Sequence, residues 1–519
     1  MSALPPISNV GLLRWAWRQL TSMKTALILL FLLALASVPG SVLPQRGIDP
    51  IKVREWITDS PTWGPILDRL GFFEVYSSVW FSAVYLLLFL SLIGCVVPRV
   101  GVHYRAMRSA PPAAPRLLQR LSGTRTLPIS AEKSEVLATA ASTLRSTRWR
   151  VVSGPSDDLQ WVSAEKGYLR ETGNLVFHLS LIVVLISVAL GGLFGWKGNV
   201  IVREGSSFSN TLTQYDAWGG GRFVNSQDLA PFSFTLDKFT VEFERGVAQR
   251  GAPRAFEAEV SYRTEPGAPL QHTLVEVNEP LEINGAKVFL VGHGYAPIIK
   301  VTDKTGAVVF EDAVPFLPQD GNFTSTGVVK IPDSTPQLGI QGLFLPTAAL
   351  DSVRGPYSTF PAADDPALFM SAFKGDLGLD SGTPQSVYRL VTDKMKQIGL
   401  QQLRPGQSWK LPDGSGTVSF EGYERWASFQ IAADPGKEIA LLAAAIAIIG
   451  LTMSLFIRRR RVWVKVVEQD GVTVVQLAGI MRTSTFEDET IGVLADDLDL
   501  IEGALESAGQ VHATTEEEV

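Results

Sequence analysis

The sequence has one cysteine, Cys95, and five histidines among 519 residues, and both scarcities limit its chemistry. A single cysteine allows no internal disulfide, no Cys-x-x-Cys redox motif and no Cys-x-x-Cys-His haem-attachment motif. We therefore exclude a thiol–disulfide oxidoreductase and a c-type cytochrome. The net charge of −6 offers no basic footprint, so we expect no nucleic-acid partner. No nucleophile elbow, phosphate loop, dinucleotide fingerprint or zinc motif is present.

Four apolar stretches stand apart from long regions of mixed polarity. Each is close to the roughly 20 residues that cross about 30 Å of hydrocarbon as a helix. The predicted spans are residues 23–43, 79–97, 175–194 and 439–457. Pro39 and Gly40 interrupt the far end of the first span, and no small-residue cleavage site follows it. We expect that span to remain uncleaved.

Basic residues flank the spans at alternate ends, and this asymmetry predicts orientation. The clusters are Arg14, Arg18 and Lys24; Arg99, Arg105 and Arg108; Lys166 and Arg170; and Arg458 to Arg461. All four fall on one side of the membrane if the spans alternate, and that side is cytoplasmic. We expect both termini and residues 98–174 inside, and residues 44–78 and 195–437 outside.

The two large polar regions differ in their patterning. Residues 195–437 alternate apolar and polar positions between frequent Gly, Pro and Asp, which predicts an extracytoplasmic β-rich, sandwich-like domain. Only residues 387–398 suggest a helix there. Residues 120–170 and the C-terminal segment 458–519 each look too small for a core, so we expect them to pack together as one α+β cytoplasmic domain. The fold class is a polytopic α-helical membrane protein carrying both domains.

His178 is the first candidate for chemistry, because it lies inside the third span. An ionisable group at membrane depth is costly and often functional, and imidazole is a leading axial ligand of haem. The alternative is a polar residue bonded to a neighbouring helix near the span's end. Residue type alone does not separate these two interpretations.

Two outer residues are further candidates. His293 lies in Val-Gly-His-Gly-Tyr-Ala-Pro, where glycines leave room for close approach, although an unliganded turn histidine is the simpler interpretation. Arg46 follows the first span and could pair with a haem propionate, although a snorkelling residue is favoured. We expect His272 on a strand surface, His103 at the membrane interface, and His512 in an uninvolved acidic tail.

Five stretches in order carry a family resemblance. They are Leu35–Arg46, Tyr168–Gly195, Val277–Pro297, Asp434–Lys437 and Arg458–Val464. Together with the three-plus-one arrangement of spans, they resemble the ResB family of system II cytochrome c biogenesis proteins. The resemblance covers most of the chain.

The resemblance implies a partner and a substrate. ResB-like proteins associate with a membrane protein called ResC or CcsA, which carries a tryptophan-rich haem-handling motif absent here. The pair exports haem b, a transient substrate, and presents it for attachment to the Cys-x-x-Cys-His of apocytochrome c. Thioredoxin-like partners keep the apocytochrome thiols reduced. The implied location is the bacterial plasma membrane, and the chain would be one subunit of a holocytochrome c synthase.

The resemblance also bears on residues and alternatives. The family's transmembrane histidine matches His178, and its outer histidine matches His293; no residue is assigned a catalytic role, and no metal beyond haem iron is expected. A scaffold that braces the partner and chaperones apocytochrome c is the main alternative. A membrane-anchored sensor lacks any signalling motif, and a secondary transporter would be unusual without repeat symmetry.

Overall fold

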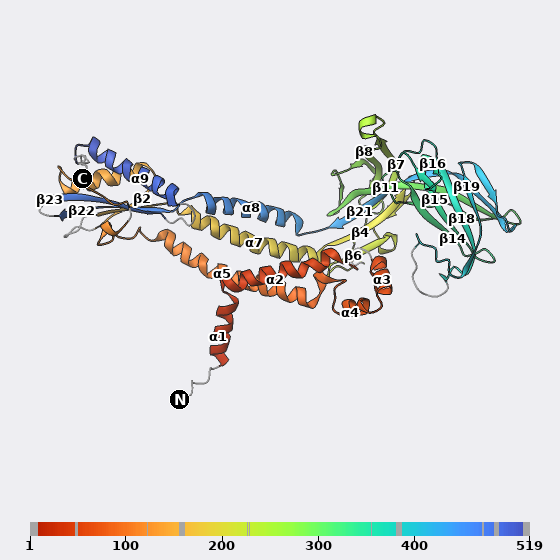
Figure 1. Ribbon diagram of the computed structural model, residues 1–519, viewed down its shortest axis with the longest axis horizontal. Helices are drawn as coiled ribbons and strands as arrows, with labels where there is room; N and C mark the ends of the chain where they lie inside the picture. The colour runs from red at the N-terminus through yellow and green to blue at the C-terminus, as the bar shows by residue number, and fades with distance from the viewer. Residues whose placement is uncertain are drawn as a thin grey trace. The chain divides into compact units, whose positions relative to one another are not determined.

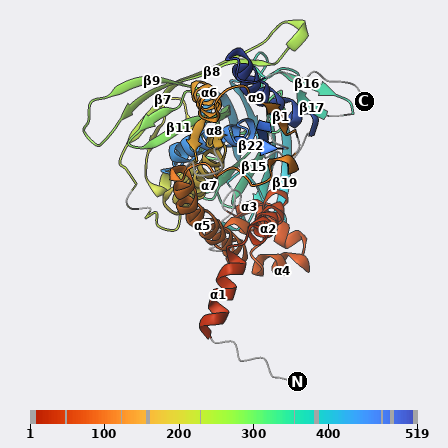
Figure 2. The ribbon, with the colours of Figure 1, turned by 90° about the vertical axis from the view of Figure 1, so that its left-hand side faces the viewer.

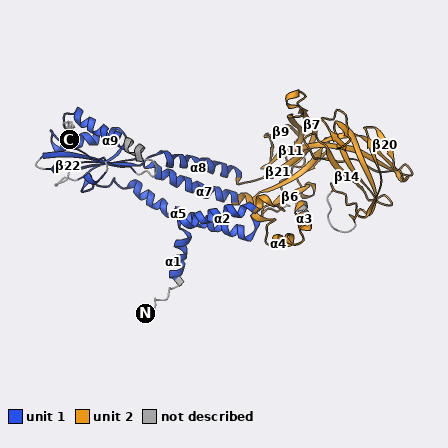
Figure 3. Cartoon of the chain, in the orientation of Figure 1, with its two compact units in different colours: residues 1–38, 76–188, 437–519 blue, residues 39–75, 189–436 orange. Residues whose placement is uncertain are grey.

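The computed structural model describes most of the chain as two compact units (Figures 1 and 3). The described residues are 9–46, 50–121, 123–154, 161–225, 227, 229–353, 355–379, 387–469, 472–481 and 487–511. Unit 1 comprises residues 1–38, 76–188 and 437–519, and unit 2 comprises residues 39–75 and 189–436.

Four helices are long and apolar enough to cross a membrane, which confirms the four predicted spans. They are α2 (Met23–Val42), α5 (Val79–Arg108), α7 (Leu169–Phe194) and α8 (Lys437–Phe456). A shorter helix, α1 (Asn9–Leu20), precedes them and leaves the axis of α2 at a steep angle (Figure 1). Pro39 does not end α2, which continues to Val42. Proline is tolerated in membrane helices where other groups satisfy the freed backbone.

Two of these helices extend beyond their apolar runs. Helix α5 contains Pro98 and continues to Arg108, and α7 begins at Leu169, before its apolar stretch. Hydropathy marks only the part of a helix that fits hydrocarbon, and the polar turns beyond it leave no apolar signal. The extensions carry His103 and Glu171.

Unit 1 also contains a five-stranded antiparallel sheet in the order β1-β23-β22-β3-β2. Its elements are β1 (Arg125–Pro128), α6 (Lys133–Ser146), β2 (Arg150–Ser153), β3 (Trp161–Lys166), β22 (Arg460–Gln469), β23 (Val472–Met481) and α9 (Glu487–Ser507). Strand β3 from the 98–174 segment pairs with β22 from the C-terminal segment. Figure 2 shows α6 and α9 beside each other along this sheet. Their apolar sides and the sheet's inner face form one core.

The linker before β1 covers part of the sheet's other face. Leu118 packs with Trp463 and Ala478 in a small apolar cluster. The Trp463 indole donates to the Pro112 carbonyl at 3.2 Å, and the buried Lys465 ammonium donates to the Arg116 carbonyl at 2.9 Å. The Pro/Ala/Arg-rich segment is therefore a packed part of this domain.

The arginines after α8 are tied into the sheet. Arg459 forms ion pairs with Glu165 and Glu171, Arg460 pairs with Asp497 at 2.6 Å, and Arg461 lies 3.2 Å from Glu165. The Glu165 side chain is only 4% exposed. Its burial is sustained by two guanidinium groups, as a buried carboxylate requires.

Unit 2 is β-rich, with two short helices, α3 (Pro50–Asp59) and α4 (Trp63–Arg69). Its strands are β4 (Trp196–Arg203), β5 (Ser207–Ser209), β6 (Ala217–Gly220), β7 (Ser233–Phe243), β8 (Pro253–Arg263), β9 (Gln271–Glu276), β10 (Leu281–Ile283), β11 (Ala286–Asp303), β12 (Val308–Ala313), β13 (Leu317–Pro318), β14 (Ser325–Ile331), β15 (Leu338–Leu345), β16 (Ala348–Asp351), β17 (Gly355–Ser358), β18 (Ala367–Gly375), β19 (Met395–Leu403), β20 (Gln407–Lys410) and β21 (Gly416–Ala433). The pairings are antiparallel, as the alternating pattern predicts.

Two long strands organise unit 2. Strands β11 and β21 pair along their length inside a seven-stranded sheet. At one end this sheet packs on the four-stranded sheet β5-β7-β8-β9, and at the other on the five-stranded sheet β13-β14-β15-β18-β19. The arrangement is sandwich-like, but it has two apolar cores that share one central sheet.

Two local predictions were wrong. Residues 387–398 form no helix, because Met395–Leu403 is strand β19 and pairs with β18. The segment around His293 is not a turn, because β11 runs through both flanking glycines. The sequence Asp470-Gly471 also predicts a hairpin turn, and these two residues lie outside the described part of the chain.

Replacing Glu165 with glutamine tests the buried ion pairs. The variant leaves Arg459 and Arg461 without the carboxylate charge between them, so β3 and β22 should lose about 3 kcal/mol of local stability. Hydrogen exchange of the full chain in detergent should show faster exchange in these strands. Glu135→Gln, at an exposed position on α6, is the control. Equal protection of these strands in both variants would contradict a stabilising role for the ion pairs of Glu165.

Candidate functional site

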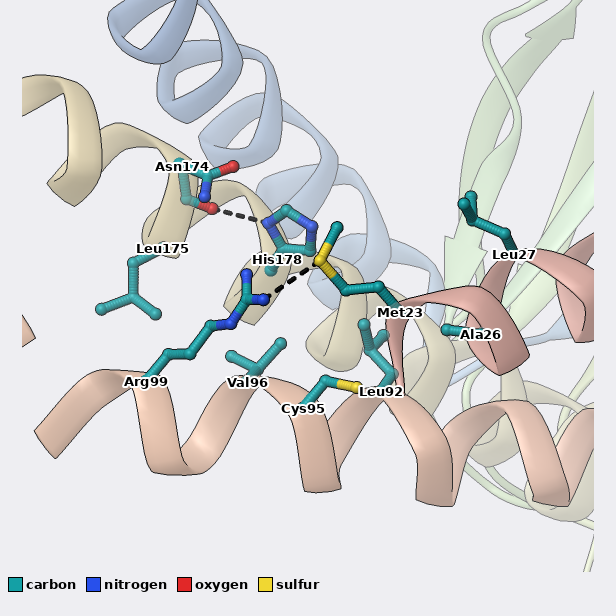
Figure 4. Close-up of a pocket in the computed structure, with 10 residues that line it drawn as sticks. All are labelled: Met23, Ala26, Leu27, Leu92, Cys95, Val96, Arg99, Asn174, Leu175 and His178. Carbon is teal, nitrogen blue, oxygen red and sulfur yellow. Dashed lines mark hydrogen bonds between the residues drawn. The ribbon is translucent and has the colours of Figure 1, made fainter. Parts of the chain in front are cut away.

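A cavity of about 120 Å³ in unit 1 contains His178 (Figure 4). It lies between α2, α5 and α7, and its lining residues are Met23, Ala26, Leu27, Leu92, Cys95, Val96, Arg99, Asn174, Leu175 and His178. Most of these side chains are apolar, while His178 and Arg99 bring a ring nitrogen donor and a cation. The cavity is therefore an apolar space with two groups that can bind a ligand.

The hydrogen bonding of His178 determines which ring nitrogen is available. Nδ1 lies 2.7 Å from the Asn174 carbonyl oxygen, one turn earlier on α7. Because a carbonyl oxygen can only accept, Nδ1 must carry the proton. In the neutral ring Nε2 then has a free lone pair, and no described residue donates a hydrogen bond to it. Metal-binding histidines commonly show this pattern, with the second nitrogen bonded to a carbonyl.

A close helix crossing positions α7 at this histidine. A methyl group added at Gly450 of α8 would lie 2.7 Å from the Phe177 amide nitrogen, and one at Gly173 would lie 2.6 Å from the Gly450 carbonyl oxygen. Small residues allow such approach in membrane bundles. Gly191 of α7, which forms a Gly-x-x-x-Gly pattern with Gly195, has a different environment because it packs against the carboxylate of Asp434.

The turn between α1 and α2 is held against α5, and this contact sets the side of the cavity that faces α7. The Ser91 hydroxyl of α5 donates to the Leu20 carbonyl at 2.5 Å, and the Cys95 thiol donates to the Thr21 carbonyl at 2.6 Å. Gly94 lies between them, where a methyl group would meet the Thr21 side chain at 2.1 Å. Cys95 is thus engaged in helix packing.

Arg99 is the only arginine or lysine that lines the described cavity. Its Nη2 lies 3.0 Å from the Met23 sulfur, a weak acceptor (Figure 4). Within the described residues it forms no ion pair with a carboxylate. The sequence grouped Arg99 with other flanking charges and did not distinguish it as a site residue.

A polar network lies on the helical extensions. His103 Nε2 lies 3.0 Å from the Thr172 hydroxyl, and its Nδ1 lies 3.7 Å from Glu171. Glu171 also pairs with Arg459, and Arg459 with Glu165 of β3. The network connects α5, α7 and the sheet of unit 1, so His103 is a packed side chain as well as a residue near the predicted interface.

His293, the outer-domain candidate, lies in an aromatic cluster within unit 2. Its ring stacks on Phe323 with centroids 4.5 Å apart and contacts Phe239, Phe243 and Phe256. Gly294, on the opposite face of β11, leaves space for the Trp426 indole, since a methyl group there would lie 2.4 Å from it. Gly294 therefore allows the Trp426 ring to pack against β11.

Burial changes the titration of His293. Desolvation lowers the pKa of His293 to about 4, and the positive charge of Arg425 adds to this effect. The ring is neutral at physiological pH. A neutral imidazole can bind a metal, but Phe323 covers this one. Phe323 has φ of 58°, a rare conformation for a bulky residue.

Arg46 is paired within its own loop. Its guanidinium lies 2.5 Å from Asp68 and 3.2 Å from Glu74. The preceding Gln45 is buried and accepts a hydrogen bond from the Val75 amide at 3.1 Å. A haem propionate would have to compete with two carboxylates for Arg46.

The remaining histidines bring no further site. His272 is exposed on β9, as predicted, and its Nδ1 lies 2.9 Å from the Ser261 hydroxyl. His512 lies outside the described residues. Within the parts of the chain that are described, no group of three or more His, Cys, Asp or Glu side chains could hold a metal ion.

Comparison with known proteins identifies the family. The ResB-like family pattern matches residues 23–489, which include all four membrane helices. The chain belongs to the ResB-like family. The resemblance seen in the sequence is therefore confirmed. His178, His293 and Arg46 all lie inside the matched region.

Several curated relatives share one name, cytochrome c biogenesis protein CcsB. The protein of Synechococcus sp. (strain WH7803) is 27% identical over 390 residues, covering 72% of this chain and 80% of the relative. The protein of Gloeobacter violaceus is 23% identical, with 86% and 84% covered. The protein of Synechococcus sp. (strain RCC307) is 25% identical, with 86% and 88% covered.

A Gly450→Ala substitution tests the crossing that positions His178. The added methyl group must displace the α7 backbone at Phe177, and overpacking of this kind costs about 1–3 kcal/mol. Amides of α7 around Phe177 should exchange faster in the full chain in detergent. Gly101→Ala, where a methyl group meets nothing within 4 Å, is the control. Identical exchange in Gly450→Ala and wild type would refute the close crossing.

The low pKa of His293 predicts a pH dependence for unit 2. Between pH 6.5 and about 4 the unfolded chain binds a proton at this residue and the folded chain does not. The stabilisation is complete above pH 6.5 and is lost as the pH falls to about 4, amounting to roughly 3 kcal/mol. Denaturant unfolding of His293→Phe should lack this component. His272→Phe should retain it, and a slope shared by both variants would contradict the assignment.

Proposed function

We propose that the chain, with a ResC/CcsA-type partner, exports haem across the membrane and presents it for attachment to apocytochrome c. The observation that carries the proposal is the free Nε2 of His178 within an apolar cavity of the helix bundle. The proposal is also supported by the relatives of the chain, which are named for cytochrome c biogenesis. In this proposal the chain is one subunit of a holocytochrome c synthase.

The proposed orientation puts haem entry at the cytoplasmic side. Basic residues at four helix ends support a cytoplasmic location for both termini and for the sheet of unit 1, with unit 2 outside a bacterial plasma membrane. The cluster after α8 is weaker support for this orientation than its four charges suggest, because Arg459, Arg460 and Arg461 have acidic partners. The basic clusters around Arg14 and Arg99 are the stronger support for it.

Haem b would pass through this site as a substrate. His178 Nε2 would ligate the iron, and the apolar side chains would contact the porphyrin. A cavity of about 120 Å³ is far too small to enclose a haem. Only part of the macrocycle would enter it, so the partner must cover the rest and supply the second axial ligand.

His293 and Arg46 are proposed as secondary haem contacts in unit 2. Iron could approach His293 only after Phe323 moved off the ring, and Arg46 would exchange Asp68 or Glu74 for a propionate. The chain has no cysteine pair to reduce apocytochrome thiols. A thioredoxin-like partner would provide that reduction, and apocytochrome c would be the acceptor.

The small size of the cavity also supports a second candidate function. If the partner holds both axial ligands, this chain acts as a scaffold that braces the partner and chaperones apocytochrome c. His178 would then be a polar residue satisfied by the Asn174 carbonyl alone. The two functions differ in what removal of the imidazole does.

The absorption spectrum of the complex with the ResC/CcsA-type partner separates them. His178→Ala should reduce the Soret band of co-purified haem at least about tenfold and abolish cytochrome c assembly, because one axial ligand is lost. Millimolar imidazole should restore the band by entering the space that the ring vacates. His272→Ala, an exposed histidine, is the control. An unchanged band with normal assembly would contradict haem ligation and favour the scaffold.

A further inference from the structure

The geometry points to Arg99 as the residue that binds a haem propionate at the His178 cavity, an inference that rests on the proposed function. Arg99 lines the cavity and is itself exposed, so its guanidinium can bind an anionic ligand that enters from solvent. Among the described residues its side-chain partner is the thioether of Met23, and no carboxylate pairs with it.

Two carboxylates of unit 1 are engaged by other arginines. Glu165 pairs with Arg459, and Asp497 pairs with Arg460. Among the described residues, no Asp or Glu lies within ion-pair distance of Arg99. The Met23 sulfur is a weak acceptor, and a carboxylate would displace it readily.

Helix geometry brings the two ligand-binding groups to one cavity. Cys95 and Arg99 are four residues apart on α5, so they share the face that lines the cavity. His178 approaches from α7, and Figure 4 shows its ring and the Arg99 guanidinium among the side chains that line the pocket. The apolar side chains of Leu27 and Leu92 line the same space.

The shape of haem matches this order of groups. Its two propionates occupy one edge, and the remainder of the macrocycle is apolar around the iron. With the iron at His178 Nε2 and the apolar edge towards Leu27 and Leu92, the propionate edge would face Arg99. The planar fork of a guanidinium can hold a carboxylate through two parallel hydrogen bonds, which an ammonium cannot do.

A phosphate headgroup of a lipid is the other anion that could reach an exposed arginine at a helix end. The two ligands differ in whether the molecule that binds Arg99 must also contact His178. A propionate contact needs the same molecule to occupy His178, whereas a lipid contact is independent of the imidazole. Esterified haem therefore distinguishes them, because the ester keeps iron and ring but loses the carboxylates.

The experiment compares ferric protoporphyrin IX with its dimethyl ester as ligands of the full chain in complex with its partner, followed by the Soret band. Wild type should bind the free acid at least about tenfold more tightly than the ester, the lower range for a charge-assisted hydrogen bond. Arg99→Gln should abolish this preference by weakening the acid alone. Arg99→Lys should retain part of it.

Arg105→Gln is the matched control, an exposed arginine between one and two turns farther along α5. It should preserve the preference, and an equal effect of both variants would reassign the result to general surface charge and overturn the inference. Equal affinities of wild type for acid and ester, as a lipid-binding role predicts, would also overturn it.

His178→Ala, measured in parallel, tells the two failures apart. If His178→Ala loses the Soret band of ligated haem and wild type binds the free acid and the ester equally, the Arg99 contact alone is refuted. An acid preference that needs Arg99, with an unchanged spectrum in His178→Ala, refutes His178 ligation alone. Absence of binding by either ligand refutes both.

Discussion

A membrane-spanning helix can carry a polar ring only where the ring's N–H donor is satisfied, and α7 meets this constraint within its own backbone. The Asn174 carbonyl accepts the Nδ1 proton of His178, which leaves Nε2 as the one ring nitrogen without a partner among the described residues. The tautomer of the neutral ring and the orientation of Nε2 follow from this bond. The close contact of Gly173 with Gly450 then sets where α7 presents the ring.

The elements around this ring depend on the same arrangement. Hydrogen bonds from Ser91 and Cys95 hold the α1–α2 turn against α5, which places Met23 and Arg99 on the cavity. The contact of His103 with Thr172 joins α5 to the start of α7, and Glu171 connects that point to Arg459. A single domain of unit 1 therefore supports the membrane helices through a continuous set of polar contacts.

Most of the fold could be predicted because long apolar runs and strand alternation are local signals. The four spans follow from hydropathy, and the β-rich region follows from period-two patterning. The course of β11 through Gly292 and Gly294 could not be predicted, because it depends on pairing with the distant strand β21 and on the Trp426 ring. Residues 395–403 likewise become a strand only through their pairing with β18.

The candidate site was only partly predictable for a similar reason. His178 stands out because an ionisable residue within an apolar run is rare. Arg99 looks like any other basic residue beside a span, and only the cavity separates it from Arg105 and Arg108. The partners of Arg46 and the aromatic cover of His293 come from distant segments that no local pattern connects.

Iron ligation by His178 is the central claim, and pulsed electron paramagnetic resonance of the ferric haem complex tests it most directly. Histidine of this chain alone would be labelled with ¹⁵N before assembly with the unlabelled partner. The account predicts a strong ¹⁵N hyperfine coupling to the iron that disappears in His178→Ala and persists in His293→Ala. A haem-loaded complex without ¹⁵N coupling, or with a coupling that survives His178→Ala, would contradict it.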